Sequence, residues 1–84
     1  GTNYEQNSKS IEDERMYTVE ATSVRCMKSR KAMRSQELEF VVQQMPNMFF
    51  VPTKEAIKKC VHSLENRDYL QRDTDDPELL MYVP

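Results

Sequence analysis

The sequence has 84 residues, of which 38% are hydrophobic and 31% are charged, and its formal net charge is −2. A chain of this length forms one domain at most, too small for a deep enzyme cleft, and no stretch approaches the roughly 20 apolar residues of a membrane span. The small charge gives no overall attraction to nucleic acid or anionic lipid, so any basic surface must be local.

The first predicted elements are a polar leader and a long helix. Residues 1–10 are almost entirely polar, and we expect a flexible leader there, because they cannot bury enough apolar surface to become ordered. The folded domain is predicted to comprise the remaining residues, 11–84. Acidic residues at positions 12–14 favour a helix from about 11 to 33, since negative charge stabilises a helix N-terminus. Its core side is predicted to contain Val19, Ser23, Cys26 and Met33, with Met16 at the edge.

Two further helices and a hairpin are predicted after the long helix. Apolar residues at helical spacing indicate a second helix over 35–45, which Pro46 ends, and a third from the cap Thr53 to about 67. Residues 47–52 suit a short strand or an extended connector. Residues 69–73 and 79–83 are extended in character and enclose a polar loop. This order predicts an α+β winged helix, a three-helix bundle with a C-terminal β-hairpin wing.

The cysteine and histidine residues indicate neither a metal site nor a catalytic site. Cys26 and Cys60 occupy apolar positions of helical patterns, which favours a reduced intracellular protein. His62 is the only histidine, and no second pair of ligands accompanies Cys60, so we predict no metal and no cofactor. No serine or cysteine is spaced to act with His62 as a nucleophile, so we predict no catalytic residue and a surface position for His62.

Lys28 is predicted to lie in solvent. On the helical wheel it stands opposite the core side, with Val24 and Met27 as exposed or half-exposed apolar neighbours. Arg25, Arg30 and Lys31 add positive charge around it. A basic run at a helix C-terminus is most often a solvated end that suits the helix dipole. Accessibility alone therefore gives Lys28 no particular role.

The residues around Lys28 resemble a family signature. The segment 24–31 reads Val-Arg-Cys-Met-Lys-Ser-Arg-Lys and is similar to the cullin signature around the modified lysine, Ile-Val-Arg-Ile-Met-Lys-x-Arg-Lys. The resemblance continues in residues 57–61 with Leu64, in 69–72 and in 82–83, with the spacing kept from about Met16 to Pro84. Only the leader lies outside it.

This resemblance implies a role and a set of partners. The domain would belong to the scaffold of a RING-type ubiquitin ligase and would not itself be an enzyme. Lys28 would accept a Nedd/Rub ubiquitin-like modifier by an isopeptide bond, which activates the ligase. The implied partners are the conjugating enzyme, a RING subunit, a Dcn-type co-ligase and a Cand-type exchange factor, in the cytoplasm and nucleus. Arg25, Arg30, Lys31 and Tyr82 are the predicted partner-binding residues.

The sequence also departs from the family pattern. Ser23, Cys26 and Glu65 stand where family members usually carry isoleucine or a similar apolar group. Lost methylene groups at such positions cost about 1 kcal/mol or more each, so we expect a less stable isolated domain. Leu80 and Pro84 replace a tyrosine and an alanine in the tail, away from the acceptor.

Two other functions fit a winged helix. A DNA-binding module would place the third helix in the major groove, but Asp73, Asp75, Asp76 and Glu78 in the wing would repel phosphate, so we predict no nucleic acid partner. A protein-interaction domain whose lysine is never modified is the other alternative, as in the more distant winged helix of the anaphase-promoting complex scaffold. The intact lysine signature favours modification.

Overall fold

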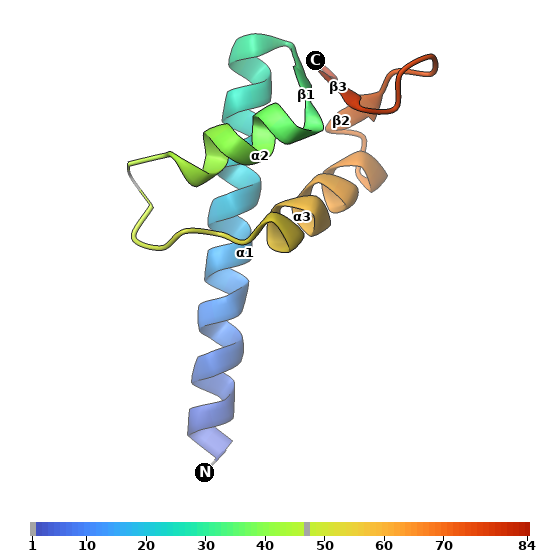
Figure 1. The fold of residues 1–84 in the computed structure, drawn as a ribbon. Coiled ribbons are helices and arrows are strands. Elements are labelled where there is room, and N and C mark those ends of the chain that lie inside the picture. Colours follow the sequence, from blue (N-terminus) through green and yellow to red (C-terminus); the bar gives the residue numbers. More distant parts are fainter. Residues whose placement is uncertain (1, 47) are drawn as a thin grey trace.

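The fold consists of three helices and a three-stranded sheet. The computed structural model describes residues 2–46 and 48–84, with the side chains of residues 11–46 and 48–84. Figure 1 shows α2 and α3 against the C-terminal half of α1, with the sheet beside the end of α1. The elements in chain order are α1 (Thr2–Arg30), β1 (Ala32–Arg34), α2 (Ser35–Gln43), α3 (Lys54–Asn66), β2 (Leu70–Arg72) and β3 (Leu79–Tyr82).

The two ends of α1 differ from the predicted helix. It begins at Thr2, within the residues predicted to form a flexible leader. The side chains of residues 1–10 lie outside the described ones, so the flexibility of that segment stays a prediction. At the other end, the prediction of a helix to Met33 is wrong, because α1 ends at Arg30 and Ala32–Arg34 form β1. None of the described helices is both long and apolar enough to cross a membrane.

A turn at Lys31 separates α1 from β1. Lys31 has a φ of 73°, in the left-handed region, and its N–H donates to the Met27 carbonyl at 2.7 Å. A left-handed residue just after the last turn is a common helix end, usually filled by glycine. The residues that follow gain their hydrogen bonds from β3, far along the chain. Helical periodicity could not reveal this strand.

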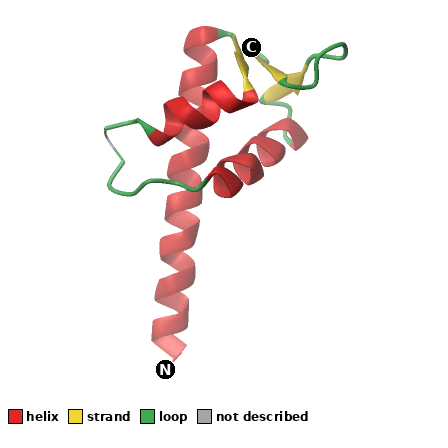
Figure 2. Cartoon of the chain, viewed as in Figure 1, coloured by secondary structure: helices red, strands yellow, loops and turns green. Residues whose placement is uncertain are grey.

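The sheet places β3 between the other two strands. The strand order is β1-β3-β2 and both pairs are antiparallel, with Leu80 opposite Met33 on one side and Arg72 on the other. Figure 2 shows the sheet at one end of the molecule, next to the end of α1. The predicted hairpin of β2 and β3 is confirmed. The strand that joins it to the first helix was missed.

The second and third helices agree with the sequence pattern. In α2 the predicted core residues Leu38 and Val42 are buried, although the helix ends at Gln43, two residues early. Thr53 caps α3, since its hydroxyl accepts a hydrogen bond from the Ala56 N–H at 3.0 Å. The connector between the helices contains no strand in its described residues.

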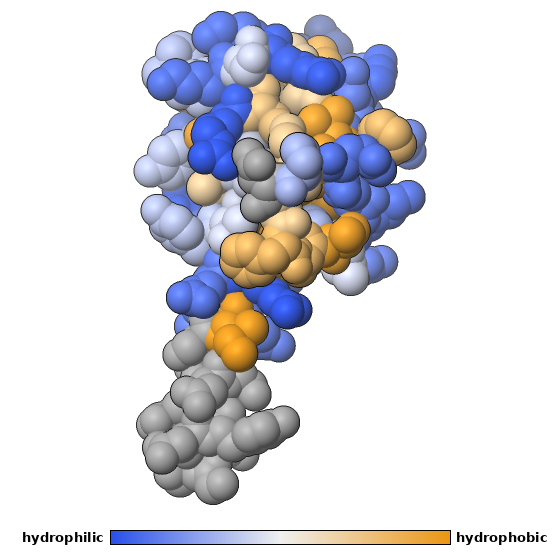
Figure 3. Space-filling view, turned by 90° about the vertical axis from the view of Figure 1, so that its left-hand side faces the viewer, coloured by the Kyte–Doolittle hydropathy of each residue, from blue (hydrophilic) through white to orange (hydrophobic). Residues whose placement is uncertain are grey.

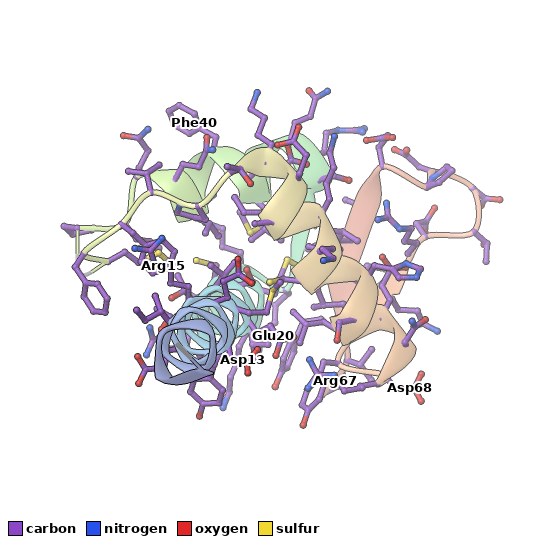
Figure 4. All side chains as sticks on the ribbon, turned by 90° about the horizontal axis from the view of Figure 1, so that it is seen from below. Asp13, Arg15, Glu20, Phe40, Arg67 and Asp68 are labelled. Carbon is purple, nitrogen blue, oxygen red and sulfur yellow. The ribbon has the colours of Figure 1, made fainter. Side chains whose placement is uncertain are left out.

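Contacts at both ends of α3 fix it beside its neighbours. The Gln43 side chain donates to the carbonyl of Pro52 at 2.9 Å, which ties the connector before α3 to α2. Just beyond the other end, Arg67 and Glu20 point toward one another and form an ion pair of 2.9 Å with α1 (Figure 4). These contacts hold α3 against both other helices.

One hydrophobic core joins all six elements. The departures at Ser23 and Cys26 do fall in this core, where both residues are buried. Glu65 instead is half-buried at its edge and accepts a hydrogen bond from Arg72 Nε at 3.0 Å. The buried hydrophobic residues are Val19, Cys26, Met27, Met33, Leu38, Val42, Ile57, Cys60, Val61, Leu64, Leu70 and Leu80.

The buried hydroxyl of Ser23 should weaken the fold. Ser23 is 0% exposed, and its Oγ is the one fully buried side-chain oxygen or nitrogen in the described residues that lacks a hydrogen-bond partner. Leaving such a group unsatisfied costs about 1–3 kcal/mol, and alanine is also the better helix former. Urea unfolding of Ser23→Ala should therefore show a gain of about 1–2 kcal/mol. Ser29→Ala, exposed on the same helix, is the control, and a loss of stability in Ser23→Ala would contradict the argument.

Both cysteines are free and buried. Cys60 Sγ lies 2.9 Å from the sulfur of Met16, within the core. Burial raises the pKa of the Cys60 thiol to about 11, and the neighbouring carboxylate of Glu20 adds to this rise. Burial also raises the pKa of Cys26, against the opposing effect of Arg30 and Arg25. Among the described residues, no cluster of three His, Cys, Asp or Glu side chains could hold a metal ion.

The raised pKa of Cys60 should make the fold less stable in alkali. A thiol in the unfolded chain ionises near 9.0, whereas folded Cys60 keeps its proton up to about 11. Between these values the unfolded chain has lost a proton that the folded chain retains, so the free energy of unfolding falls as pH rises. The loss amounts to roughly 2–3 kcal/mol. Cys60→Ala should lose that much less than the wild type between pH 8 and 11 in urea unfolding. Equal losses would contradict the assignment.

Candidate functional site

Lys28 lies exposed on the last turn of α1. Arg30 ends the helix two residues later, and Lys31 makes the turn into β1. Within the part of the chain whose side chains are described, the Lys28 ammonium has no hydrogen bond, ion pair or aromatic contact. The predicted exposure of this amine is confirmed, and its position is set by the end of a rigid helix.

The residue before Lys28 corrects the sequence prediction. We expected Met27 to be exposed or half-exposed, but it is 0% exposed, whereas Val24 is half-buried. The buried side of α1 is wider than the predicted stripe because α2, α3 and the sheet all pack against it. Thr22 is buried for the same reason. Lys28 therefore follows a residue anchored in the core, which restrains the backbone beneath its side chain.

The structure brings together two of the predicted partner-binding residues, Lys31 and Tyr82. The Tyr82 N–H donates to the Lys31 carbonyl at 2.8 Å, and the Lys31 ammonium lies 5.6 Å from the centre of the Tyr82 ring. A cation at this distance over an aromatic face is attracted by the ring. Lys31 and Tyr82 are 51 positions apart in the sequence, so only the pairing of β1 with β3 reveals their contact.

The arginines near Lys28 make weaker contacts. Arg30 forms an ion pair of 3.4 Å with Glu37, and both side chains are about half exposed. Arg25 reaches the Thr22 hydroxyl at 3.5 Å. Exposed ion pairs of this kind contribute little to stability, so both guanidinium groups can turn toward a partner at small cost. Arg25 and Arg30 line a hollow of about 410 Å³ between α1 and α2, together with Cys26, Val41 and Met45.

The wing is acidic, as predicted, and internally bonded. The Asp73 carboxylate accepts hydrogen bonds from the N–H groups of Asp75 and Asp76, and Asp76 forms an ion pair of 3.0 Å with Arg34. These carboxylates would repel a phosphate backbone at the edge where a winged helix usually meets DNA. His62 is exposed on α3, as predicted for a surface residue.

A second surface lies away from Lys28. Ile11, Tyr17, Phe49 and Val51 are large apolar residues that are at least half exposed, on α1 and on the connector between α2 and α3. Figure 3 shows apolar surface in the middle of the face that contains this connector. The sequence predicts no role for these residues, because the exposure of their side chains depends on how the connector and α1 pack in the fold.

Comparison with known proteins identifies what this arrangement resembles. Residues 14–76 match the family model described as the cullin protein neddylation domain. The chain is 38% identical over 82 residues to Cullin-1 of Oryza sativa subsp. japonica and 35% identical over 78 residues to Cullin-3 of Caenorhabditis elegans. These alignments cover 94% and 93% of this chain but 11% and 10% of those proteins. The chain thus spans about a tenth of the length of these relatives.

A solved structure shares the fold. It is described as "A Dual E3 Mechanism for Rub1 Ligation to Cdc53: Dcn1(P)-Cdc53(WHB)". The TM-score is 0.86 and the identity 28%, over 95% of this chain and 92% of that one. This similarity confirms the predicted α+β winged helix.

Proposed function

The chain belongs to the cullin family, whose neddylation domain it contains, and we propose that its Lys28 accepts a Nedd/Rub-type ubiquitin-like modifier through an isopeptide bond. The observation that carries the proposal is the exposed ammonium of Lys28 on the last turn of α1, next to the buried Met27. A nucleophile held on a rigid element has less freedom to lose when it meets its partner.

The proposed reaction needs only an accessible amine from this domain. The deprotonated nitrogen of Lys28 attacks the thioester carbonyl that links the modifier to its conjugating enzyme. A C–N bond forms, the C–S bond breaks, the sulfur leaves as a thiolate, and the nitrogen gives up one proton. The domain is therefore a substrate in this step, and the modified product would activate a RING-type ubiquitin ligase of which the full-length protein is the scaffold.

The proposed partners follow from the same family membership. A Dcn-type co-ligase has the most direct support, because the similar Cdc53 domain is described together with Dcn1. Arg25, Arg30, Lys31 and Tyr82 are our proposed contacts, and they lie on the end of α1, in the turn after it and in β3. The conjugating enzyme, a RING subunit and a Cand-type exchange factor complete the proposed set, in the cytoplasm and nucleus.

Reconstituted conjugation tests this function. The chain is incubated with the modifier, its activating and conjugating enzymes, a RING partner and a Dcn-type co-ligase. Intact mass spectrometry should show the addition of one modifier, and peptide mapping should find it on Lys28. A modifier attached mainly to another lysine would overturn the site, and a chain that gains none would overturn the function.

A further inference from the structure

We propose that Tyr82 is a positioning residue that directs the modifier to Lys28, by holding the amine of the neighbouring Lys31 against its aromatic ring. This inference rests on the proposed function of Lys28. It concerns what in the structure keeps the modifier from the second lysine of the signature segment, since Lys31 is three residues from Lys28 and both are exposed.

The backbone of Lys31 is held on both sides. Its N–H donates to the Met27 carbonyl at 2.7 Å, and its carbonyl accepts from the Tyr82 N–H at 2.8 Å. Its φ of 73° takes the chain out of the helix, so Lys31 does not continue the helical face that carries Lys28. The left-handed turn thus directs Lys31 toward β3, while Lys28 stays on the outer face of α1.

The side chain of Lys31 is then held by the ring. Its ammonium lies 5.6 Å from the centre of the Tyr82 ring, whereas the Lys28 ammonium has no such partner among the described residues. Tyr82 is half-buried, so the ring itself is fixed by its packing against the core. An amine must leave the ring before it can attack a carbonyl. The usual strength of an exposed cation–π contact corresponds to about a two- to fivefold preference.

The preference for Lys28 over Lys31 that the ring produces adds to the preference that the left-handed turn at Lys31 already produces. Tyr82→Leu removes the ring but keeps an apolar side chain, so the ratio of modifier on Lys31 to modifier on Lys28 should rise about two- to fivefold. Tyr82→Phe keeps the ring and should keep the wild-type ratio. Tyr69→Leu is the matched control, because Arg67 lies 5.5 Å over that ring and the pair includes neither Lys28 nor Lys31. A merely structural role of Tyr82 would lower modification at both sites and leave the ratio unchanged.

Chemical labelling separates this inference from the proposed function. A trace amount of the N-hydroxysuccinimide ester of acetic acid acetylates free amines and releases N-hydroxysuccinimide, without any enzyme. In the native wild type, the labelling ratio of Lys31 to Lys28 should be about two to five times lower than in the urea-unfolded chain. That comparison needs no variant, so it holds even if Tyr82→Leu fails to fold.

The labelling and conjugation experiments test the inference and the proposed function separately. A labelling ratio that shifts in Tyr82→Leu but not in Tyr82→Phe or Tyr69→Leu supports the hold of the ring on Lys31. If the enzymatic modifier then maps to another lysine, the proposed function of Lys28 fails while this hold stands. A native labelling ratio equal to that of the unfolded chain overturns it, even if Lys28 proves to be the acceptor. Peptide mass spectrometry after cleavage by a glutamate-specific protease reads both sites.

Discussion

Lys28→Arg should reduce attachment of the modifier to about one hundredth of the wild-type rate or less. Arginine keeps the positive charge and the approximate length of the side chain, but its guanidinium stays protonated and offers no nucleophilic nitrogen. The nearest other amine, Lys31, leaves α1 through a left-handed turn and lies over Tyr82. Because displacement of a reacting group by even 1 Å can cost about a hundredfold in rate, Lys31 should substitute poorly.

The measurement is the initial rate of the mass-shifted product in the reconstituted reaction. Lys31→Arg is the matched control, since it removes an amine three residues away and keeps the charge, and it should remain modified. Circular dichroism should show both variants folded, because both positions are exposed. Equal rates for Lys28→Arg and the wild type would remove Lys28 from the site and leave the family assignment in place.

Met27→Ala should produce a large loss of stability. The Met27 side chain is 0% exposed in the core, and truncation of a buried methionine to alanine typically costs about 2–5 kcal/mol. Domains of this kind have a total free energy of unfolding of about 5–15 kcal/mol, so this single change removes a considerable share. If Met27 were exposed or half-exposed, as the sequence predicts, the loss of stability would be much smaller. The experiment therefore distinguishes a buried from an exposed Met27.

Urea unfolding followed by circular dichroism measures this difference. Phe40→Ala is the control, because its side chain is larger but 64% exposed on α2, and surface changes usually stay within about 0.5 kcal/mol. The methionine variant should unfold at a clearly lower urea concentration than the phenylalanine variant. Similar midpoints for the two would contradict the burial of Met27 beside Lys28.

Much of the fold follows from local signals in the sequence. The apolar residues of α2 and α3 recur at helical spacing, and Thr53 supplies the hydroxyl that caps α3. Leu70 and Leu80 fall in the two segments predicted to be extended, and both are buried in the hairpin. Such signals depend on residues close together in the chain, and the exposure of Lys28 followed from the same periodicity.

The functional prediction for Lys28 depended on a different kind of information. Helical periodicity placed Lys28 in solvent but could not distinguish it from the other lysines, since exposed cations at a helix end are common. The resemblance to the cullin signature singled it out, and the match of residues 14–76 then showed the family. The structure adds two observations to that choice: the Lys28 ammonium has no hydrogen bond, ion pair or aromatic contact among the described side chains, and the backbone is anchored at Met27.

The sequence by itself determined three helices, a C-terminal hairpin, part of the core side of α1 and the exposure of Lys28, because each depends on residues close together in the chain. The tertiary structure alone decided the turn at Lys31, the strand β1, the burial of Met27 and the contact of Lys31 with Tyr82. The turn, the strand and the contact depend on β3, which follows far along the chain, and the burial of Met27 depends on α2, α3 and the sheet together. Hydrogen bonds between distant strands and packing from three sides leave no periodic trace in the local sequence, so the surroundings of Lys28 became visible only in the fold.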